Sequence, residues 1–189
     1  GMATGKMKGS FKEILQKLKS TGYAVKCKLM NSQWYGVPQS RNRLIFIGTS
    51  NGISPSFPNP TVKKTITVKE ALKNCPNGII KQVSSRLLPY VILTKPGETV
   101  AKYHPKHSLF NYRKLHPYKQ APTLSKTGTI IHYEYNRLIT DNEAKRLSSF
   151  PDDFILIGSL LQRLARIGNA VMPKFMEAIA KHIKTEILK

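Results

Sequence analysis

The sequence predicts an α/β fold in which the edge of a small sheet is joined to an irregular, basic insert. Residues 10–22 have the apolar spacing of a helix, residues 23–48 contain two strand-like stretches, and residues 79–136 have no regular period. Apolar residues make up 40% of the 189-residue chain, which is enough to form a core. A wholly disordered basic tail is therefore not expected.

The charge of the chain indicates a polyanionic partner. Lys and Arg number 31 and Asp and Glu number 10, so the formal net charge is +21. Nucleic acid is the first candidate, because neutralising phosphates releases counterions. An anionic membrane surface is the second, although the basic residues are not gathered on one amphipathic helix. The alternative is that the lysines serve only solubility.

The sequence has few signs of disulfide, metal or membrane chemistry. Two cysteines, Cys27 and Cys75, cannot form a disulfide framework, and no Cys/His cluster has zinc spacing, so no metal site is assigned. No apolar run is long enough to cross a membrane, and no leader pattern precedes the first helix. We therefore expect a reduced, cytoplasmic protein with no membrane partner.

The N-terminal part predicts a helix, a strand, a loop and a second strand. Ser10 and Glu13 form a capping box at the start of a helix that Gly22 would end. From Tyr23 to Leu29 apolar and polar residues alternate, which predicts a strand. Residues 44–47 form a continuous apolar run of the length of a buried strand. This order is typical of the edge of an α/β sheet.

The middle of the chain predicts two short helices around an irregular, basic region. Capping boxes at Thr67/Glu70 and Thr140/Glu143 mark the helix starts. Between them, residues 79–136 mix basic and aromatic side chains, which suits contacts with phosphates and bases. The alternative is a loop-rich surface whose aromatic residues fill a small core. The basic residues that we expect to contact DNA are Arg113, Lys114, Lys119 and Lys126.

The C-terminal part predicts two further helices. One begins at Ser159 and ends at Gly168, and the next begins at Pro173, which suits the first helical position. One apolar face of the last helix would pack against the sheet; it consists of Met176, Ile179, Ala180, Ile183 and Ile187.

The loop before the second strand carries two closely spaced arginines. Residues 35–43 read YGVPQSRNR, and on an extended segment Arg41 and Arg43 point to opposite sides. One can face a pocket while the other faces a phosphate. Because Arg has a rigid fork of donors and stays charged, it can orient a ring that bears a carbonyl. The alternative is an edge strand with two solvated arginines.

Three segments resemble, in order, sequence motifs of the DNA cytosine-5 methyltransferases. Residues 36–48, GVPQSRNRLIFIG, are similar to the eighth motif of that family. Residues 137–154 resemble the ninth motif, and residues 167–173, followed by an amphipathic helix, resemble the tenth. Residues 121–124, Ala-Pro-Thr-Leu, resemble the Thr-Leu pair of its target-recognition region. The resemblance covers most of this chain but only the back half of the family's chain.

The resemblance implies a fold and a division into domains. The fold would be the partial sheet edge of a Rossmann-like, S-adenosylmethionine-dependent methyltransferase, plus a small irregular α+β target-recognition domain. Residues 2–49 and 155–189 would belong to the catalytic domain, with the last helix returning to its sheet. Residues 50–154 would form the target-recognition domain.

The resemblance also implies a chemistry for which this sequence lacks essential parts. In the family, a Pro-Cys cysteine attacks a cytosine flipped from the duplex, a Glu-Asn-Val glutamate contacts the base, and a Gly-rich turn holds S-adenosylmethionine. None of these motifs occurs here, and Cys75 precedes a proline instead of following one. The chain alone is therefore expected to be inactive. Its partners would be duplex DNA and a second polypeptide, or a missing N-terminal half, that carries the absent motifs.

The resemblance implies that several residues contact the DNA. Arg43 would donate to the cytosine O2, Arg41 would contact a phosphate beside the flipped nucleotide, and Gln39 would shape the pocket entrance. Thr123 and Leu124 of the Thr-Leu pair would contact DNA.

The tenth motif implies the cofactor residues. Asn169, with the backbone near Ala170 and Val171, would line the S-adenosylmethionine site, and Phe150 would lie near the same cofactor. Asn169 and Arg43 are expected to form two sides of one cavity. The alternative is that Asn169 satisfies backbone groups between two helices and that Phe150 is a core residue.

Three other functions remain open at this point. The chain could be a stand-alone DNA-binding module that has lost catalysis, or part of an RNA-directed cytosine methyltransferase. It could also be a basic structural protein of a ribonucleoprotein particle, which would not bind S-adenosylmethionine in any assembly.

Overall fold

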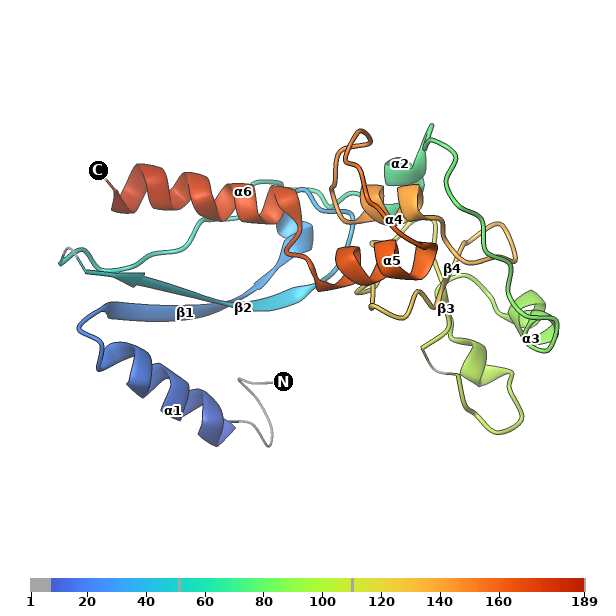
Figure 1. The fold of residues 1–189 in the computed structure, drawn as a ribbon, viewed down its shortest axis with the longest axis horizontal. Coiled ribbons are helices and arrows are strands. Elements are labelled where there is room, and N and C mark those ends of the chain that lie inside the picture. The colour runs from blue at the N-terminus through green and yellow to red at the C-terminus, as the bar shows by residue number, and fades with distance from the viewer. Residues whose placement is uncertain (1–7, 51, 110, 189) are drawn as a thin grey trace.

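The chain forms two lobes in the computed structural model (Figure 1). We call residues 8–59 with 170–188 the hairpin lobe, and residues 60–169 the insert lobe. The structure describes residues 8–50, 52–109 and 111–188. Residues 2–7 of the predicted catalytic portion and the side chain of Ser10, with its predicted capping role, lie outside the described part.

The hairpin lobe begins with the predicted helix, strand, loop and strand. Helix α1 (Lys8–Lys19) starts two residues before the predicted position, and Gly22 follows it with a positive φ of 86°. Strands β1 (Ala24–Asn31) and β2 (Asn42–Thr49) pair antiparallel, with Ala24 opposite Thr49. A short 3-10 helix, η1 (Ser32–Tyr35), occupies part of the connecting loop. The α/β class is therefore confirmed for this region.

The two faces of the hairpin are covered unequally. Phe46 of β2 packs against Phe11 of α1, with their ring centroids 6.1 Å apart. On the opposite face, Met30 and Ile47 are buried in a core with residues of the C-terminal helix. The strand that the alternation predicted is confirmed as β1, although Leu29 near its end remains 59% exposed. Only Ile47 of the apolar run 44–47 is buried, because one edge of β2 is open.

The C-terminal helix lies over the hairpin (Figure 1). Helix α6 (Pro173–His182) starts at Pro173 as predicted and continues as a π-helical turn, η3 (Ile183–Ile187). The predicted apolar face is confirmed in part, because Ile179 and Ile187 are buried and Ile183 packs against the same core. Met176 and Ala180 of that face are exposed, whereas Phe175 and Ala178 are buried in their place. The Phe175 ring packs on Tyr35, with ring centroids 5.1 Å apart.

The insert lobe consists of short elements joined by long irregular segments. Its elements are α2 (Val68–Leu72), α3 (Leu88–Leu93), η2 (Val100–Lys102), β3 (Arg113–Lys114), β4 (Ile130–Ile131), α4 (Asp141–Leu147) and α5 (Leu160–Asn169). The capping boxes predicted at Thr67 and Thr140 are both formed, and Ser159 forms a third with Gln162. Strands β3 and β4 pair in parallel over two residues each.

Helix α5 belongs to the insert core, which corrects the predicted domain boundary at residue 155. Leu160, Leu164 and Ile167 are buried together with Ala144 and Leu147 of α4. The chain enters the hairpin core only at Met172. Residues 155–169 therefore pack with the insert lobe, because the apolar face of α5 meets α4 and not the sheet.

Within the part of the chain that the structure describes, the helices are too short or too polar to cross a bilayer.

Candidate DNA and cofactor site

The loop of residues 31–43 is shaped by its own polar side chains. The Asn31 Oδ1 accepts hydrogen bonds from the backbone N–H groups of Gln33 and Arg41, both at 3.1 Å. The Ser32 hydroxyl donates to the carbonyl of Gln39 at 2.7 Å. These bonds bring the two ends of the loop together, so that the arginines follow a defined turn.

Arg41 connects three distant segments of the chain. Its side chain is 4% exposed, and its guanidinium donates to the carbonyls of Leu124 at 3.0 Å and Gly168 at 2.5 Å. Burial, with a smaller effect of Arg43, lowers the pKa of Arg41 to about 10, so it stays charged at neutral pH. The predicted phosphate contact is therefore corrected, since Arg41 joins the eighth-motif, Thr-Leu and tenth-motif segments to one another.

Gln39 and Leu124 are also internal, in contrast to their predicted roles. The Gln39 side chain is fully buried; its Nε2 donates to the Ser148 hydroxyl at 3.1 Å, and its Oε1 accepts from the Leu124 N–H at 3.4 Å. The Leu124 side chain lies in the insert core. Neither side chain is presented to a ligand, because both fill the contact between the loop and the insert lobe.

Arg43 differs from Arg41 in its surroundings. It is half-buried on β2 opposite Met30, and its Nη1 donates to the Asn42 carbonyl at 2.8 Å. Burial lowers the pKa of Arg43. Among the described residues no carboxylate forms an ion pair with it. Most of its donors are therefore available to a ligand.

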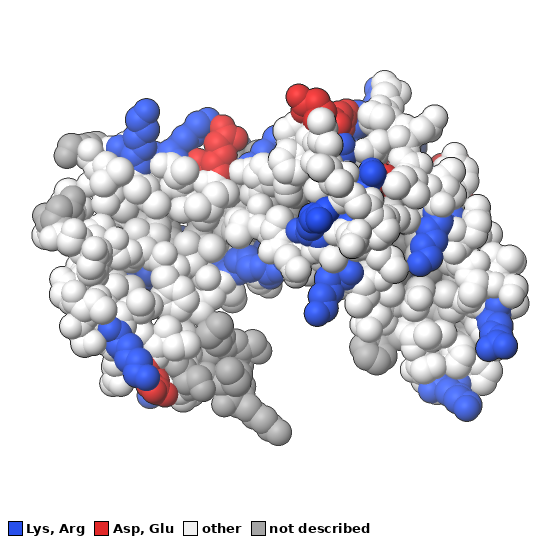
Figure 2. Space-filling model, in the orientation of Figure 1, with Lys and Arg blue, Asp and Glu red and all other residues white. Residues whose placement is uncertain are grey.

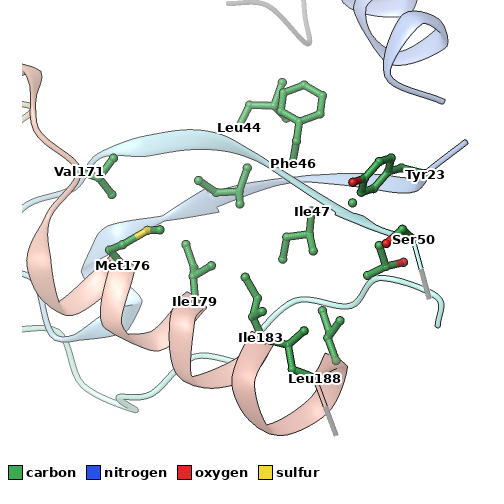
Figure 3. A pocket seen from close by; sticks show the side chains of 14 residues that line it. Tyr23, Leu44, Phe46, Ile47, Ser50, Val171, Met176, Ile179, Ile183 and Leu188 are labelled. Carbon is green, nitrogen blue, oxygen red and sulfur yellow. The ribbon is translucent and has the colours of Figure 1, made fainter. Parts of the chain in front are cut away.

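The predicted cofactor residues lie where α5 ends. Asn169 is exposed, Ala170 is half-buried, and Val171 lies at one end of an apolar cavity of about 720 Å³ (Figure 3). This cavity runs along the edge of β2 that is not paired with β1, and Met176 and Ile179 of α6 line its other side. Arg41 brings this segment to the loop, since it binds the carbonyl of Gly168.

Phe150 lines a different cavity from Val171, and its predicted place beside the cofactor stays a prediction. Ser149 has a positive φ of 60°, and the Phe150 ring packs on Phe154 with centroids 5.0 Å apart. Phe150 lines a cavity of about 510 Å³ with Arg146 and Lys174, whereas Val171 lines the cavity beside β2.

The residues near Asn169 fit part of an S-adenosylmethionine site. The exposed amide of Asn169 can donate and accept hydrogen bonds, and the adjacent Val171 offers apolar contact. The cavity beside β2 is otherwise lined mainly by apolar side chains. The amino acid and ribose groups of such a cofactor would therefore need polar partners from other polypeptide segments.

The predicted DNA-binding residues of the insert fall into two groups. Lys114 is 6% exposed, and its ammonium donates to the Val91 carbonyl at 2.9 Å and to the Asn136 Oδ1 at 3.2 Å. Its predicted DNA contact is corrected, because these bonds hold α3 against β3. The exposed group consists of Arg113, Lys119, Thr123 and Lys126. Figure 2 shows Lys and Arg over both lobes of the visible face, with few Asp or Glu.

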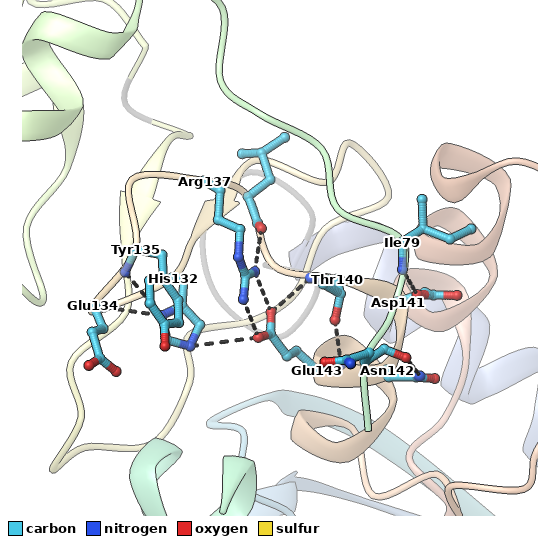
Figure 4. Close-up of polar contacts among 11 residues, drawn as sticks. Ile79, His132, Glu134, Tyr135, Arg137, Thr140, Asp141, Asn142 and Glu143 are labelled. Carbon is cyan, nitrogen blue, oxygen red and sulfur yellow. Dashed lines mark hydrogen bonds and ion pairs between the residues drawn. The ribbon is translucent and has the colours of Figure 1, made fainter. Parts of the chain in front are cut away.

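A buried polar cluster supports the start of α4 (Figure 4). Arg137 donates two hydrogen bonds to the Glu143 carboxylate, at 2.9 and 2.7 Å, and the Thr140 N–H donates a third at 2.8 Å. Burial alone would raise the pKa of Glu143, but these bonds hold it below its ordinary value. The role of Arg137 was not predicted from its sequence position. The available signal was an arginine six residues before the glutamate of a capping box.

His132 completes this cluster in its neutral form. Its Nδ1 accepts hydrogen bonds from the backbone N–H groups of Glu134 at 3.1 Å and Tyr135 at 3.3 Å, so the ring proton is on Nε2. Burial lowers the pKa of His132 despite the nearby Glu143. The ring stacks between Tyr133 and Tyr135.

Comparison with known families decides the assignment. The sequence profile of the C-5 cytosine-specific DNA methylases matches residues 1–185, which is nearly the whole chain. The chain belongs to this family. The resemblance of the three motif-like segments is thereby supported by a match over the full region that contains them.

The relatives of this methylase chain are considerably longer than it is. It is 33% identical to the type II methyltransferase M1.HphI of Haemophilus parahaemolyticus, covering 90% of this chain and 50% of the relative. It is 36% identical to the putative type II methyltransferase M.MJ0563P of Methanocaldococcus jannaschii, covering 93% of this chain and 58% of the relative. The chain therefore spans about half the length of the curated relatives that it matches.

Solved structures share the fold of this methylase chain. A putative DNA modification methyltransferase encoded within an Escherichia coli prophage superposes with a TM-score of 0.77 at 21% identity, covering 98% of this chain and 67% of that structure. The Entamoeba histolytica methyltransferase EhMeth gives a TM-score of 0.64 at 18% identity, covering 95% of this chain and 58% of that structure. At these identities the likeness concerns the fold.

Neither cysteine of the methylase chain resembles a nucleophile. Cys75 is half-buried, and burial raises the pKa of its thiol to about 11, so the thiol is protonated at neutral pH. Cys27 is half-buried within β1. Among the described residues, no group of three or more His, Cys, Asp or Glu could hold a metal ion.

Proposed function

We propose that this chain is the C-terminal, DNA-binding part of a DNA cytosine-5 methyltransferase. It would bind duplex DNA and contribute residues to the flipped-cytosine and S-adenosylmethionine sites. The absent Pro-Cys and Glu-Asn-Val motifs would come from a further polypeptide segment, so the chain alone would transfer no methyl group.

The observation that carries this proposal is the set of bonds made by Arg41. Through the carbonyls of Leu124 and Gly168, this side chain ties the loop of Arg43 to the insert and to the segment of Asn169. The segments that the proposal assigns to the base, the DNA and the cofactor thus meet around one buried guanidinium. A charge-assisted hydrogen bond is stronger than a neutral one, and a pair of them gives a fixed geometry.

Arg43 would orient the flipped base. Carbons 5 and 6 of cytosine are stacked inside the duplex, so the base has to leave the helix before it reacts. The Arg43 guanidinium has no acidic partner among the described side chains and can donate to the O2 carbonyl of the ring. The exposed Arg113, Lys119, Thr123 and Lys126 would bind the DNA that flanks it.

S-adenosylmethionine would supply the methyl group when bound. Asn169 would hold it through its exposed amide, together with the backbone at Ala170 and the side chain of Val171. The remainder of that site would lie on the segment that this chain lacks.

The decisive experiment measures methyl transfer to duplex DNA by the chain alone and after mixing with a polypeptide that carries the front motifs of the Haemophilus relative. We expect no transfer by the chain alone and measurable transfer by the mixture. Arg43→Ala should lower the restored rate about 100-fold or more while duplex binding is retained. Lys184→Ala, an exposed position on η3, is the control and should leave the rate unchanged.

Other outcomes identify the competing functions. Duplex binding without restored transfer in any assembly would favour a stand-alone DNA-binding module. Stronger competition by transfer RNA than by duplex DNA at matched salt would favour an RNA-directed enzyme, since salt sets the electrostatic part of both affinities. Transfer by the purified chain alone would contradict the proposal.

A further inference from the structure

An apolar segment projects from the insert lobe between α4 and α5 (Figure 1). We call residues 154–157 the exposed segment. Ile155 and Ile157 are 82% and 76% exposed, whereas Leu156 between them packs against the insert core. This alternation is that of an extended chain, in which side chains two residues apart lie on the same side. The two isoleucines therefore form one apolar surface that faces outward.

Cationic side chains from the two flanking helices hold the backbone of the exposed segment. Lys145 of α4 donates to the Phe154 carbonyl at 3.1 Å, and Arg166 of α5 donates to the Ile157 carbonyl. Hydrogen bonds from charged donors are stronger than neutral ones. The isoleucines are thus kept in position at the surface, where they are available to another molecule.

One backbone edge of the exposed segment is also open. Within the described part of the chain, the N–H groups of Ile155 and Ile157 donate to no backbone carbonyl. An extended apolar segment with free N–H groups is a ready template for pairing with another strand. The partner should therefore present an extended apolar segment of its own.

Opposite charges at the two ends of the exposed segment indicate which partner this is. Asp153 precedes the segment, and Arg166 is bound to the carbonyl of its last residue. Neither side chain forms an ion pair with any residue that the structure describes. Four residues of extended chain span up to about 13 Å, so the apolar surface separates the acidic end from the basic end.

We propose that the exposed segment binds the same segment of a second copy of this chain, antiparallel and around a two-fold axis. A two-fold contact has to be self-complementary. The antiparallel arrangement meets this condition, because it brings Asp153 of each copy to Arg166 of the other and packs the isoleucines between them. A parallel arrangement would instead bring like charges together. The contact is small, so the dimer is weak and transient.

Sedimentation velocity on the full chain tests this proposal. About 0.15 M salt gives a Debye length of about 8 Å, which screens the repulsion between two chains of charge +21. We expect a monomer–dimer equilibrium with a dissociation constant on the order of tens of micromolar. Ile155→Asp should weaken association at least about tenfold, because it places an unpaired charge in the contact. Ile92→Asp makes the same change at a 59% exposed position of α3 and should have no effect.

Two charge reversals test the antiparallel arrangement. Asp153→Arg brings two cations together at each end of the contact, and Arg166→Glu brings two anions together. Each variant alone should associate at least about tenfold more weakly than the unaltered chain. An equimolar mixture of the two should regain the dimer, because both ends then join opposite charges. A variant that had lost its fold would not be rescued by mixing.

Three results would overturn the proposal. A chain that stays monomeric at several hundred micromolar, roughly ten times the expected dissociation constant, has no such contact. Equal weakening by Ile155→Asp and Ile92→Asp would show that the contact does not lie at the exposed segment. A mixture of the two charge variants that remains monomeric would contradict the antiparallel arrangement.

Discussion

Both lobes leave large apolar side chains exposed, such as Ile155 and Ile157 of the insert lobe at 82% and 76%, but the lobes differ in how their elements enclose a core. In the insert lobe, α4 and α5 enclose a core in which Leu147 is fully buried, and the polar cluster around Glu143 is hydrogen-bonded. In the hairpin lobe, Met176 and Leu188 remain 49% and 68% exposed and line a cavity of about 720 Å³. A two-stranded sheet is marginally stable by itself.

Under the proposed function, this difference indicates which lobe would contact a further polypeptide segment. In the insert lobe, residues of α4 and α5 pack against one another in a shared core. In the hairpin lobe, β2 has an open edge flanked by apolar side chains. The chain spans about half the length of its curated relatives. The hairpin lobe is therefore the part whose stability and function we would expect to change most if the proposed further segment were supplied.

The largest expected effect concerns the link between the lobes. Arg41→Ala leaves the carbonyls of Leu124 and Gly168 without their charged donor and should lower the free energy of unfolding by about 4 kcal/mol. Urea unfolding followed by the fluorescence of Trp34, the single tryptophan, measures it. Arg43→Ala, two residues away and half-buried, is the matched control and should cost less than about 1 kcal/mol. Equal effects would contradict a linking role for Arg41.

A pair of truncations tests the unequal burial directly. Leu147→Ala removes a fully buried side chain from the insert core and should cost about 3 kcal/mol. Met176→Ala removes a side chain of similar size that is half exposed in the hairpin lobe, and should cost less than about 1 kcal/mol. Similar losses in urea unfolding would show that the cores are equally complete.

The smallest expected effect is a pH dependence confined to the insert lobe. Because burial lowers the pKa of His132, the unfolded chain binds a proton at a higher pH than the folded chain does. Its contribution to stability is therefore present above the ordinary histidine pKa of about 6.5 and is lost as the pH falls below it. Glu143, whose pKa is also lowered, loses its contribution only below about pH 4.3.

Hydrogen exchange at pH 7.5 and 5.5 measures this effect in each lobe. Exchange protection of residues 130–147 should fall at pH 5.5, whereas residues 24–49 should change little. His132→Asn, whose side-chain oxygen can accept from the same two backbone N–H groups, should remove the difference. A pH-dependent loss that persists in this variant would assign the effect to other groups.

Much of the local structure was predictable because its causes lie within a few residues. The capping boxes at Thr67, Thr140 and Ser159 each join side chains three positions apart, and all three helix starts are formed as predicted. Pro173 begins α6 for a similarly local reason, since its fixed φ suits a first helical turn.

The candidate site was predictable in its segments but not in the orientation of its side chains. Arg41 and Lys114 were predicted to contact DNA, yet each donates to backbone carbonyls of segments far away in the sequence. The exposure of Ile155 and Ile157 was not predicted either, since an apolar run does not show which of its side chains the fold covers.

Local spacing and motif order were thus sufficient to indicate the α/β class, the helix starts and the family. They could not indicate that Arg41 is internal while Arg43 is available, or that α5 packs with the insert. Burial of a charged side chain depends on carbonyl groups that the folded chain brings from 83 and 127 residues away. Helix capping depends on a hydroxyl three residues from its partner. The sequence therefore indicates where a helix begins, whereas only the folded chain decides which charged side chain is buried.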